Sequence, residues 1–130
     1  MNRRRVSWAV PALAAGLCLL GATSTGAQPA AAAAERWPEV GRQGIVRMVI
    51  APLALARDRE AHARQIEIIC AEPGTCFVNF YTNSTGAELA MPLPDSVSQE
   101  PTVMFRRSAK LGAELFRWSC RLAIDPVNCF

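Results

Sequence analysis

The sequence predicts a small α+β domain in which one main helix packs on a mostly antiparallel sheet of three or four strands. Three observations support this fold class: one helical stretch at residues 55–70, short β-branched or alternating segments on both sides of it, and an even number of cysteines beyond an export leader. The expected order is strand, helix, strand, short helical turn, strand, strand, held by two disulfides.

The first 27 residues have the three parts of a secretory signal peptide. Arg3, Arg4 and Arg5 precede an apolar run at residues 6–20, and small residues follow up to Ala27, where we expect cleavage. The Arg- and Ala-rich leader is typical of a bacterial protein. Because Pro11 interrupts a run shorter than the ~20 residues that span a bilayer, an uncleaved anchor is the less favoured alternative. We therefore expect a periplasmic or secreted protein with no stable membrane span after cleavage.

Removal of the leader would leave a domain without net charge. The chain has 14 basic and 11 acidic residues, a net charge of +3, and three of the basic residues belong to the leader. A neutral domain lacks the positive field that attracts nucleic acid or anionic membranes. Nucleic acid is therefore not an expected partner.

Residues 28–43 are expected to form a flexible Ala- and Pro-rich tether before a disulfide-stapled domain at residues 44–130. The tether contains Pro29 and five consecutive alanines at residues 30–34. Such a low-complexity stretch beside a cleavage site has little apolar surface to bury.

The first elements of the domain are a strand and the main helix. Residues 45–50 are β-branched and lie between Gly44 and Pro52, which predicts a strand. Residues 55–70 carry apolar side chains at helical spacing, which predicts the helix. Pro73 and Gly74 then suit a type II turn, since Pro presets the first turn angle and Gly tolerates a positive φ.

Residues 75–82 predict a second strand with apolar groups on both faces, Val78 and Phe80 on one and Phe77 and Tyr81 on the other. Residues 95–100 could form a single helical turn, because Ser96 and Gln99 have the spacing of a capping box.

Residues 101–122 allow two interpretations. A helix at residues 102–110 would end at Gly112, but its apolar residues are consecutive and form no stripe. A hairpin would pair residues 102–107 with residues 114–122, where apolar and polar side chains alternate in the second arm. That period of two favours the hairpin.

Four cysteines follow the leader, and an even number in an oxidising compartment favours two disulfides. The preferred pairing is Cys70 with Cys76 across the Pro-Gly turn and Cys120 with Cys129 at the end of the chain. The rival pairing is Cys76 with Cys120 and Cys70 with Cys129. The spacing does not match a zinc site or a redox motif, so neither a metal nor a cofactor is expected.

No catalytic constellation is recognisable. His62 is the only histidine and falls on the apolar side of the predicted helix, which favours a packed position over a general base. The sequence contains no nucleophile elbow, Walker loop or dinucleotide fingerprint. No catalytic residue is therefore assigned, and a non-enzymatic role is favoured.

Two surfaces are candidates for binding. The first is the sheet face opposite the core, which is expected to collect Arg47, Asn79, Tyr81, Arg106, Arg117 and Arg121. Arginine and tyrosine commonly recognise carboxylates and protein surfaces, although a solvated face with Arg–Glu pairs is the alternative. The second is the loop at residues 83–95, whose Leu89, Met91 and Leu93 could make contacts or tuck under the helix.

The sequence therefore predicts an exported, non-catalytic domain that binds a protein or a component of the cell envelope. The alternative is a small envelope hydrolase or an inhibitor of one.

Overall fold

The computed structural model describes residues 35–130. The expected signal peptide and residues 28–34 of the expected tether lie outside the described residues.

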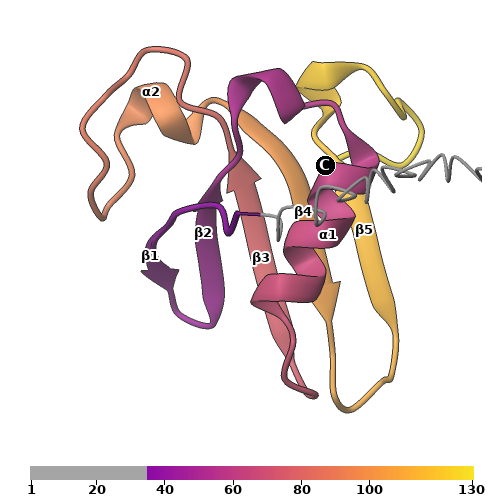
Figure 1. Ribbon diagram of the computed structural model, residues 1–130. Coiled ribbons are helices and arrows are strands. Elements are labelled where there is room, and N and C mark those ends of the chain that lie inside the picture. Colours follow the sequence, from indigo (N-terminus) through magenta and orange to yellow (C-terminus); the bar gives the residue numbers. More distant parts are fainter. Residues whose placement is uncertain (1–34) are drawn as a thin grey trace, which may run out of the picture. The chain divides into compact units, whose positions relative to one another are not determined.

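The described chain is a five-stranded sheet with one main helix, which confirms the predicted α+β class (Figure 1). The sheet has one strand more than the upper expectation. In chain order the elements are β1 Glu39–Gln43, β2 Val46–Ile50, α1 Arg59–Ile69, β3 Cys76–Tyr81, α2 Asp95–Ser98, β4 Pro101–Arg107 and β5 Glu114–Trp118. Two 3₁₀ turns, Leu53–Leu55 and Cys120–Leu122, complete the chain.

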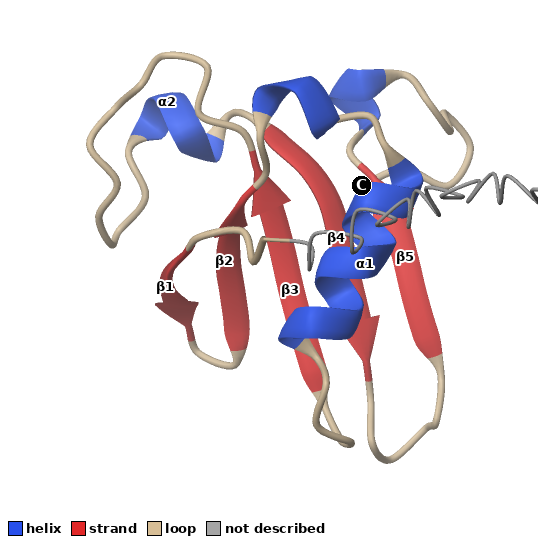
Figure 2. Cartoon of the chain, in the orientation of Figure 1, coloured by secondary structure: helices blue, strands red, loops and turns tan. Residues whose placement is uncertain are grey.

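Neighbours in the sheet follow the chain order, β1-β2-β3-β4-β5 (Figure 2). Among the strands of residues 35–130, only β2 and β3 are parallel, and α1 makes the crossover between them. The other three pairs are antiparallel. The pairing of Phe105 with Phe116 shows that residues 101–118 form a hairpin, so the strand interpretation of this segment is correct.

The additional strand is β1, which the sequence had assigned to the tether. It pairs with β2 through a tight turn in which Gly44 has a φ of 60°, a conformation that favours glycine. Just before it, Trp37 is only 6% exposed and belongs to the core. The predicted tether therefore extended too far along the chain. Its last residues were missed because β1 alone, with the sequence EVGRQ, has little strand character.

The core lies between α1 and one face of the sheet. The register aligns one row of core residues across four strands: Val49, Phe80, Val103 and Trp118. From α1, Ala61, Ile66 and Ile69 pack against this face. Asp58 caps the start of the helix by accepting a hydrogen bond from the Ala61 N–H at 2.9 Å.

Two disulfides close the domain, and both preferred pairings are confirmed. Cys70 and Cys76 have Cα atoms 5.8 Å apart and join the end of α1 to the start of β3. Cys120 and Cys129 have Cα atoms 4.9 Å apart and hold the C-terminal segment beside β5. The short helical turn expected near residue 95 is α2.

Within residues 35–130, no helix combines the length and apolar character needed to cross a bilayer.

Candidate functional site

The sheet face that points away from α1 carries four of the six predicted binding residues. We call it the open face. The register places Asn79 beside Met104, and Met104 in turn beside Arg117. Tyr81 and Arg106 lie two residues from Asn79 and Met104 on the same strands, so their side chains point to the same face. The half-exposed apolar members of this face are Val46, Phe77, Met104 and Leu115, the last of which is 39% exposed.

Three of these residues form a hydrogen-bonded row. Arg106 donates from Nη2 to Oδ1 of Asn79 at 2.8 Å, and Asn79 donates from Nδ2 to the Tyr81 hydroxyl at 3.4 Å. The Arg106 guanidinium also lies over the ring of Phe77, 5.2 Å from its centroid. Burial lowers the pKa of Arg106, but a guanidinium remains charged at any physiological pH. The row therefore holds one oriented cation over the middle of the open face.

Backbone contacts hold this guanidinium still. Nη1 of Arg106 donates to the carbonyls of Val78 at 3.1 Å and Phe105 at 2.8 Å. Because Nη1 and Nη2 together make three bonds, the side chain has little rotational freedom. A ligand would meet a preorganised group, which reduces the entropy lost on binding.

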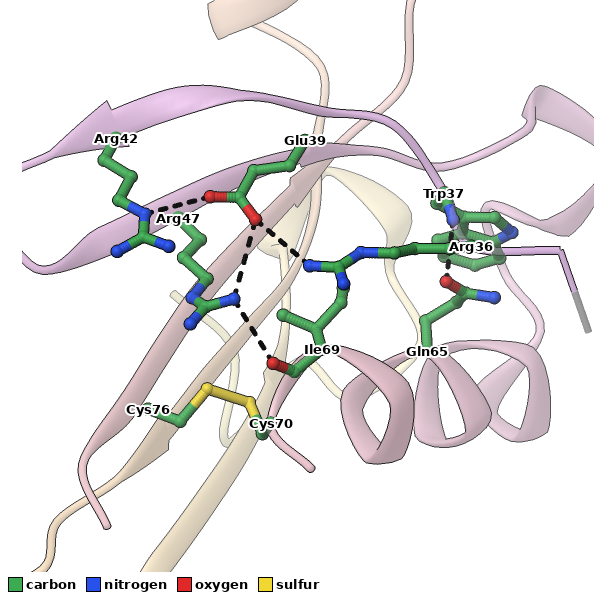
Figure 3. Close-up of polar contacts among 9 residues, drawn as sticks. All are labelled: Arg36, Trp37, Glu39, Arg42, Arg47, Gln65, Ile69, Cys70 and Cys76. Carbon is green, nitrogen blue, oxygen red and sulfur yellow. Dashed lines mark hydrogen bonds and ion pairs between the residues drawn. A yellow bond between two sulfur atoms is a disulfide. The ribbon is translucent and has the colours of Figure 1, made fainter. Parts of the chain in front are cut away.

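Arg47 lies on the opposite side of the sheet, so its predicted placement on the binding face is wrong. It pairs in register with Val78, which is a core residue. Its Nη1 donates to the carbonyl of Ile69 at 3.3 Å and lies 3.6 Å from Oε2 of Glu39 (Figure 3). The sequence left both faces of β2 plausible as core, because Met48 and Val49 are both apolar, and both are buried in the fold.

Glu39 forms ion pairs with three arginines near the end of α1. Its carboxylate lies within 4 Å of the guanidinium groups of Arg36, Arg42 and Arg47, as Figure 3 shows. A polar recess of about 310 Å³ beside this cluster is lined by Arg36, Arg47 and the Cys70–Cys76 disulfide. Since Arg47 binds both Glu39 and a helix carbonyl, the cluster ties β1 and β2 to α1.

Arg121 lies in the 3₁₀ turn after β5 and in none of the strands, so it does not join the row on the open face. Its Nε donates to the carbonyl of Pro101 at 2.7 Å, and its Nη2 donates to Thr82 at 3.2 Å. Thr82 donates in turn to Glu100 at 2.8 Å, and Ser84 also bonds Glu100. These bonds, the one from the Ser84 hydroxyl foremost, lower the pKa of Glu100. Arg121 thus anchors the loop that follows β3.

The loop predicted as a second binding surface folds onto the open face. A Cβ built on Gly41 would lie 2.4 Å from Cγ of Met91, which shows how closely the loop approaches β1. Between loop and sheet is a recess of about 450 Å³, within the size range of small-ligand sites. Its lining is mostly apolar and consists of Gln43, Met48, Tyr81, Met91, Pro92, Leu93 and Ser98.

Tyr81 belongs to both the recess and the hydrogen-bonded row. The two surfaces that the sequence suggested separately are therefore continuous, and we call this combined surface the recess site. Gln43, Met48 and Ser98 are members that sequence reasoning missed. No sequence pattern pointed to these three residues, because only the path of the loop across β1 and β2 brings them close to Tyr81.

His62 occupies the core, as its position on the apolar face of the helix predicted. It is fully buried, and its ring packs edge-on against those of Trp37, Phe80 and Trp118 at centroid distances of 5.0, 5.1 and 5.4 Å. Burial lowers its pKa below the ordinary value of 6.5, although Asp58 partly opposes this shift. A neutral imidazole enclosed by aromatic rings has no access to a substrate.

Comparison with protein-family models, with curated proteins and with solved structures found no match to this chain.

Proposed function

We propose that this protein is an exported, non-catalytic domain that binds a protein or another component of the cell envelope through the recess site. The observation that carries the proposal is the convergence of the 83–95 loop with the open face at Tyr81. There an apolar recess adjoins a row of polar groups that ends in the oriented Arg106 guanidinium.

The chemistry of the recess site suits a ligand with an apolar group next to a carboxylate or carbonyl. Met48, Met91 and Leu93 offer an apolar lining, and methionine adapts its shape to an inserted side chain. Arg106 can add a charge-assisted hydrogen bond to an acidic neighbour of that side chain. Arg117 is exposed on the same face and adds to its positive charge.

The proposed location rests on two features. Two disulfides favour an oxidising compartment, and residues 1–27 have the composition of an export signal. Together they support the periplasm or the extracellular space as the place where the ligand would be met.

The test is partner recovery from envelope extract with matched variants. Met91→Asp places a charge in the recess and Arg117→Glu reverses the charge beside the row. Arg117 is exposed, so its replacement should change the melting temperature little. Met91 rests on Gly41, so the melting temperature of Met91→Asp is measured to show that the variant is folded. Arg64→Glu makes the same charge reversal on the exposed side of α1 and serves as the control.

A partner recovered by the unaltered domain and by Arg64→Glu, but lost with Met91→Asp and Arg117→Glu, would support the recess site. Equal recovery by all four proteins would contradict it.

A further inference from the structure

The two edges of the sheet differ in how they are protected from pairing with another strand. At β1, a register shift between Glu39 and Gly41 interrupts the ladder, and Met91 lies against Gly41. At β5, five consecutive residues pair with β4 without a shift, and the strand contains no proline. An edge without a bulge or proline is suited to adding a further strand.

The phase of the β4–β5 ladder shows which backbone groups of β5 point outward. The Ser108 N–H donates to the carbonyl of Ala113, and the Ser119 N–H donates to that of Thr102. The backbone N–H and C=O groups of the odd-numbered residues of β5 therefore face β4, and those of Glu114, Phe116 and Trp118 face away from it.

At one end of β5 the outward carbonyl is already used. The Phe130 N–H donates to the outward carbonyl of Trp118 at 3.1 Å, and the Cys120 N–H donates to the carbonyl of Phe130 at 3.1 Å. The outward N–H and C=O groups of Glu114 and Phe116 bond no group within residues 35–130. Two adjacent pairing positions thus remain on this edge.

We propose that a second copy of this chain occupies this edge, with the two β5 strands antiparallel about a two-fold axis at Leu115. This register pairs Glu114 of each copy with Phe116 of the other, so it uses the open N–H and C=O groups of both residues in four backbone hydrogen bonds. A register centred on Phe116 would instead require the Trp118 carbonyl, which Phe130 occupies. The result is a continuous ten-stranded sheet.

The side chains are complementary in this register. On the open face, Leu115 meets its own copy, which shields an apolar side chain that is 39% exposed in the single chain. On the α1 side, Glu114 of one copy lies opposite Phe116 of the other. The Arg59 guanidinium stacks on that Phe116 ring, 4.3 Å from its centroid. The acid of one copy therefore reaches the arginine of the other, twice by symmetry.

In the part of the chain that the structure describes, the charges that would form these pairs have no competing partner. Within residues 35–130, neither Arg59 nor Glu114 lies within 4 Å of an opposite charge. A recess of about 390 Å³ beside them, whose lining includes Arg59, Glu114 and Phe116, leaves room for a second carboxylate. The interface is small, so we expect a reversible dimer rather than an obligate one.

This inference does not depend on the proposed function, because it rests on the outward backbone groups of β5, whereas the recess at Tyr81 is lined by β1, β2, β3 and the residues between β3 and β4. A dimer would present two recess sites on the same side of one sheet, which would strengthen binding to a repeated envelope ligand by avidity.

A charge exchange tests the dimer. Protein purified after expression of the full chain is followed by sedimentation velocity from micromolar to millimolar concentration. Arg59→Glu places two acidic side chains together at both contacts, and Glu114→Arg places two basic side chains together. The dissociation constant of each variant's dimer should therefore rise about tenfold or more. Mixed together, the two variants should form a heterodimer, because both contacts again join opposite charges. Arg57→Glu, an exposed neighbour outside the interface, should dimerise like the unaltered protein.

Leu115→Lys gives a second disruption that keeps the interior intact, since the two lysines would face each other across the axis. A melting temperature close to that of the unaltered protein shows that each variant is folded. The proposal would be overturned if the unaltered protein stayed monomeric throughout the concentration range. It would also be overturned by single variants that dimerise normally, by a mixture that fails to associate, or by an equal loss in Arg57→Glu.

Discussion

The Nε2 atom of His62 lies 3.0 Å from the hydroxyl of Thr102, so a residue of α1 and a residue of β4 are hydrogen-bonded inside the core. The other ring nitrogen, Nδ1, lies 2.7 Å from the carbonyl of Asp58. Since a carbonyl only accepts, Nδ1 carries the hydrogen, and the Thr102 hydroxyl donates to Nε2. Every polar atom of the imidazole is thus satisfied in its neutral form.

The neutral imidazole predicts a loss of stability in mild acid. Burial lowers the pKa of His62 in the folded protein, whereas the unfolded chain protonates near 6.5. Above 6.5 both states are neutral and stability is complete; below it only the unfolded chain takes up the proton. The free energy of unfolding should therefore fall by up to about 1.4 kcal/mol for each pH unit below 6.5, until the folded state also protonates. Urea unfolding at a series of pH values measures this slope.

Because His62 is the only histidine, its replacement provides a clean control. His62→Gln should be less stable at neutral pH but should lose the dependence between about pH 5 and pH 7. The lowered pKa of Glu100 acts in the same direction, but at more acidic pH. An unchanged slope in the variant would show that another group is responsible.

Removing the Cys70–Cys76 disulfide should cost moderate stability. The pair closes a loop with a sequence separation of 6, for which loop entropy predicts about 2 kcal/mol. Cys70→Ala with Cys76→Ala should lower the free energy of unfolding by this amount and leave the far-ultraviolet circular dichroism unchanged. The slightly longer Cys120–Cys129 loop, with a separation of 9, predicts a similar loss of about 3 kcal/mol. A much larger loss at either position would mean that the disulfide also maintains the packing around it.

Arg107 should contribute more to the stability of the fold than an exposed arginine on a strand does. Its guanidinium donates to the carbonyls of Gly74 at 2.8 Å, Cys70 at 3.0 Å and Glu72 at 2.7 Å. A lysine keeps the charge but cannot satisfy three separate carbonyls, so Arg107→Lys should cost about 1–3 kcal/mol. Arg117→Lys, in the exposed position on β5, is the matched control and should change stability by less than about 0.5 kcal/mol. Equal effects in thermal denaturation would contradict this role.

Gly41 and Met91 should be energetically coupled. A methyl group at position 41 would collide with Met91 Cγ at 2.4 Å, so Gly41→Ala should push the loop away from the open face. Shortening the side chain with Met91→Ala should remove most of that cost in the double variant. A coupling energy of about 0.5–3 kcal/mol in a double-mutant cycle is typical of residues in direct contact. Additive effects would show that the loop does not rest on β1.

The same pair connects stability with the proposed binding role, because Met91 lines the recess. Gly41→Ala should therefore weaken binding at the recess site as well, and Met91→Ala should not restore it.

Local patterns in the sequence predicted much of the fold. The helical spacing before Cys70 predicted α1, and the period of two after residue 114 predicted β5. The Pro73-Gly74 turn predicted the preferred cysteine pairing, because a reversal between a helix and a strand brings their ends together. Each of these signals involves residues close in the chain.

The candidate site was only partly predictable. Asn79, Tyr81 and Arg106 were grouped correctly because alternation on adjacent strands determines their shared face. Arg47 was placed on the wrong side because apolar residues on both faces of β2 made its core side ambiguous. Arg107 was overlooked, since its carbonyl partners lie more than 30 residues earlier in the chain.

By itself, then, the sequence determined the helix, most strands and the presence of two disulfides, and it favoured the pairing that the fold adopts, because these follow from spacing, turn residues and cysteine count. Only the tertiary structure decided that β1 and Trp37 join the domain, that Arg47 and Arg107 bind the end of α1, and that the 83–95 loop meets the open face at Tyr81. These features depend on contacts between distant segments, whose geometry no local pattern encodes.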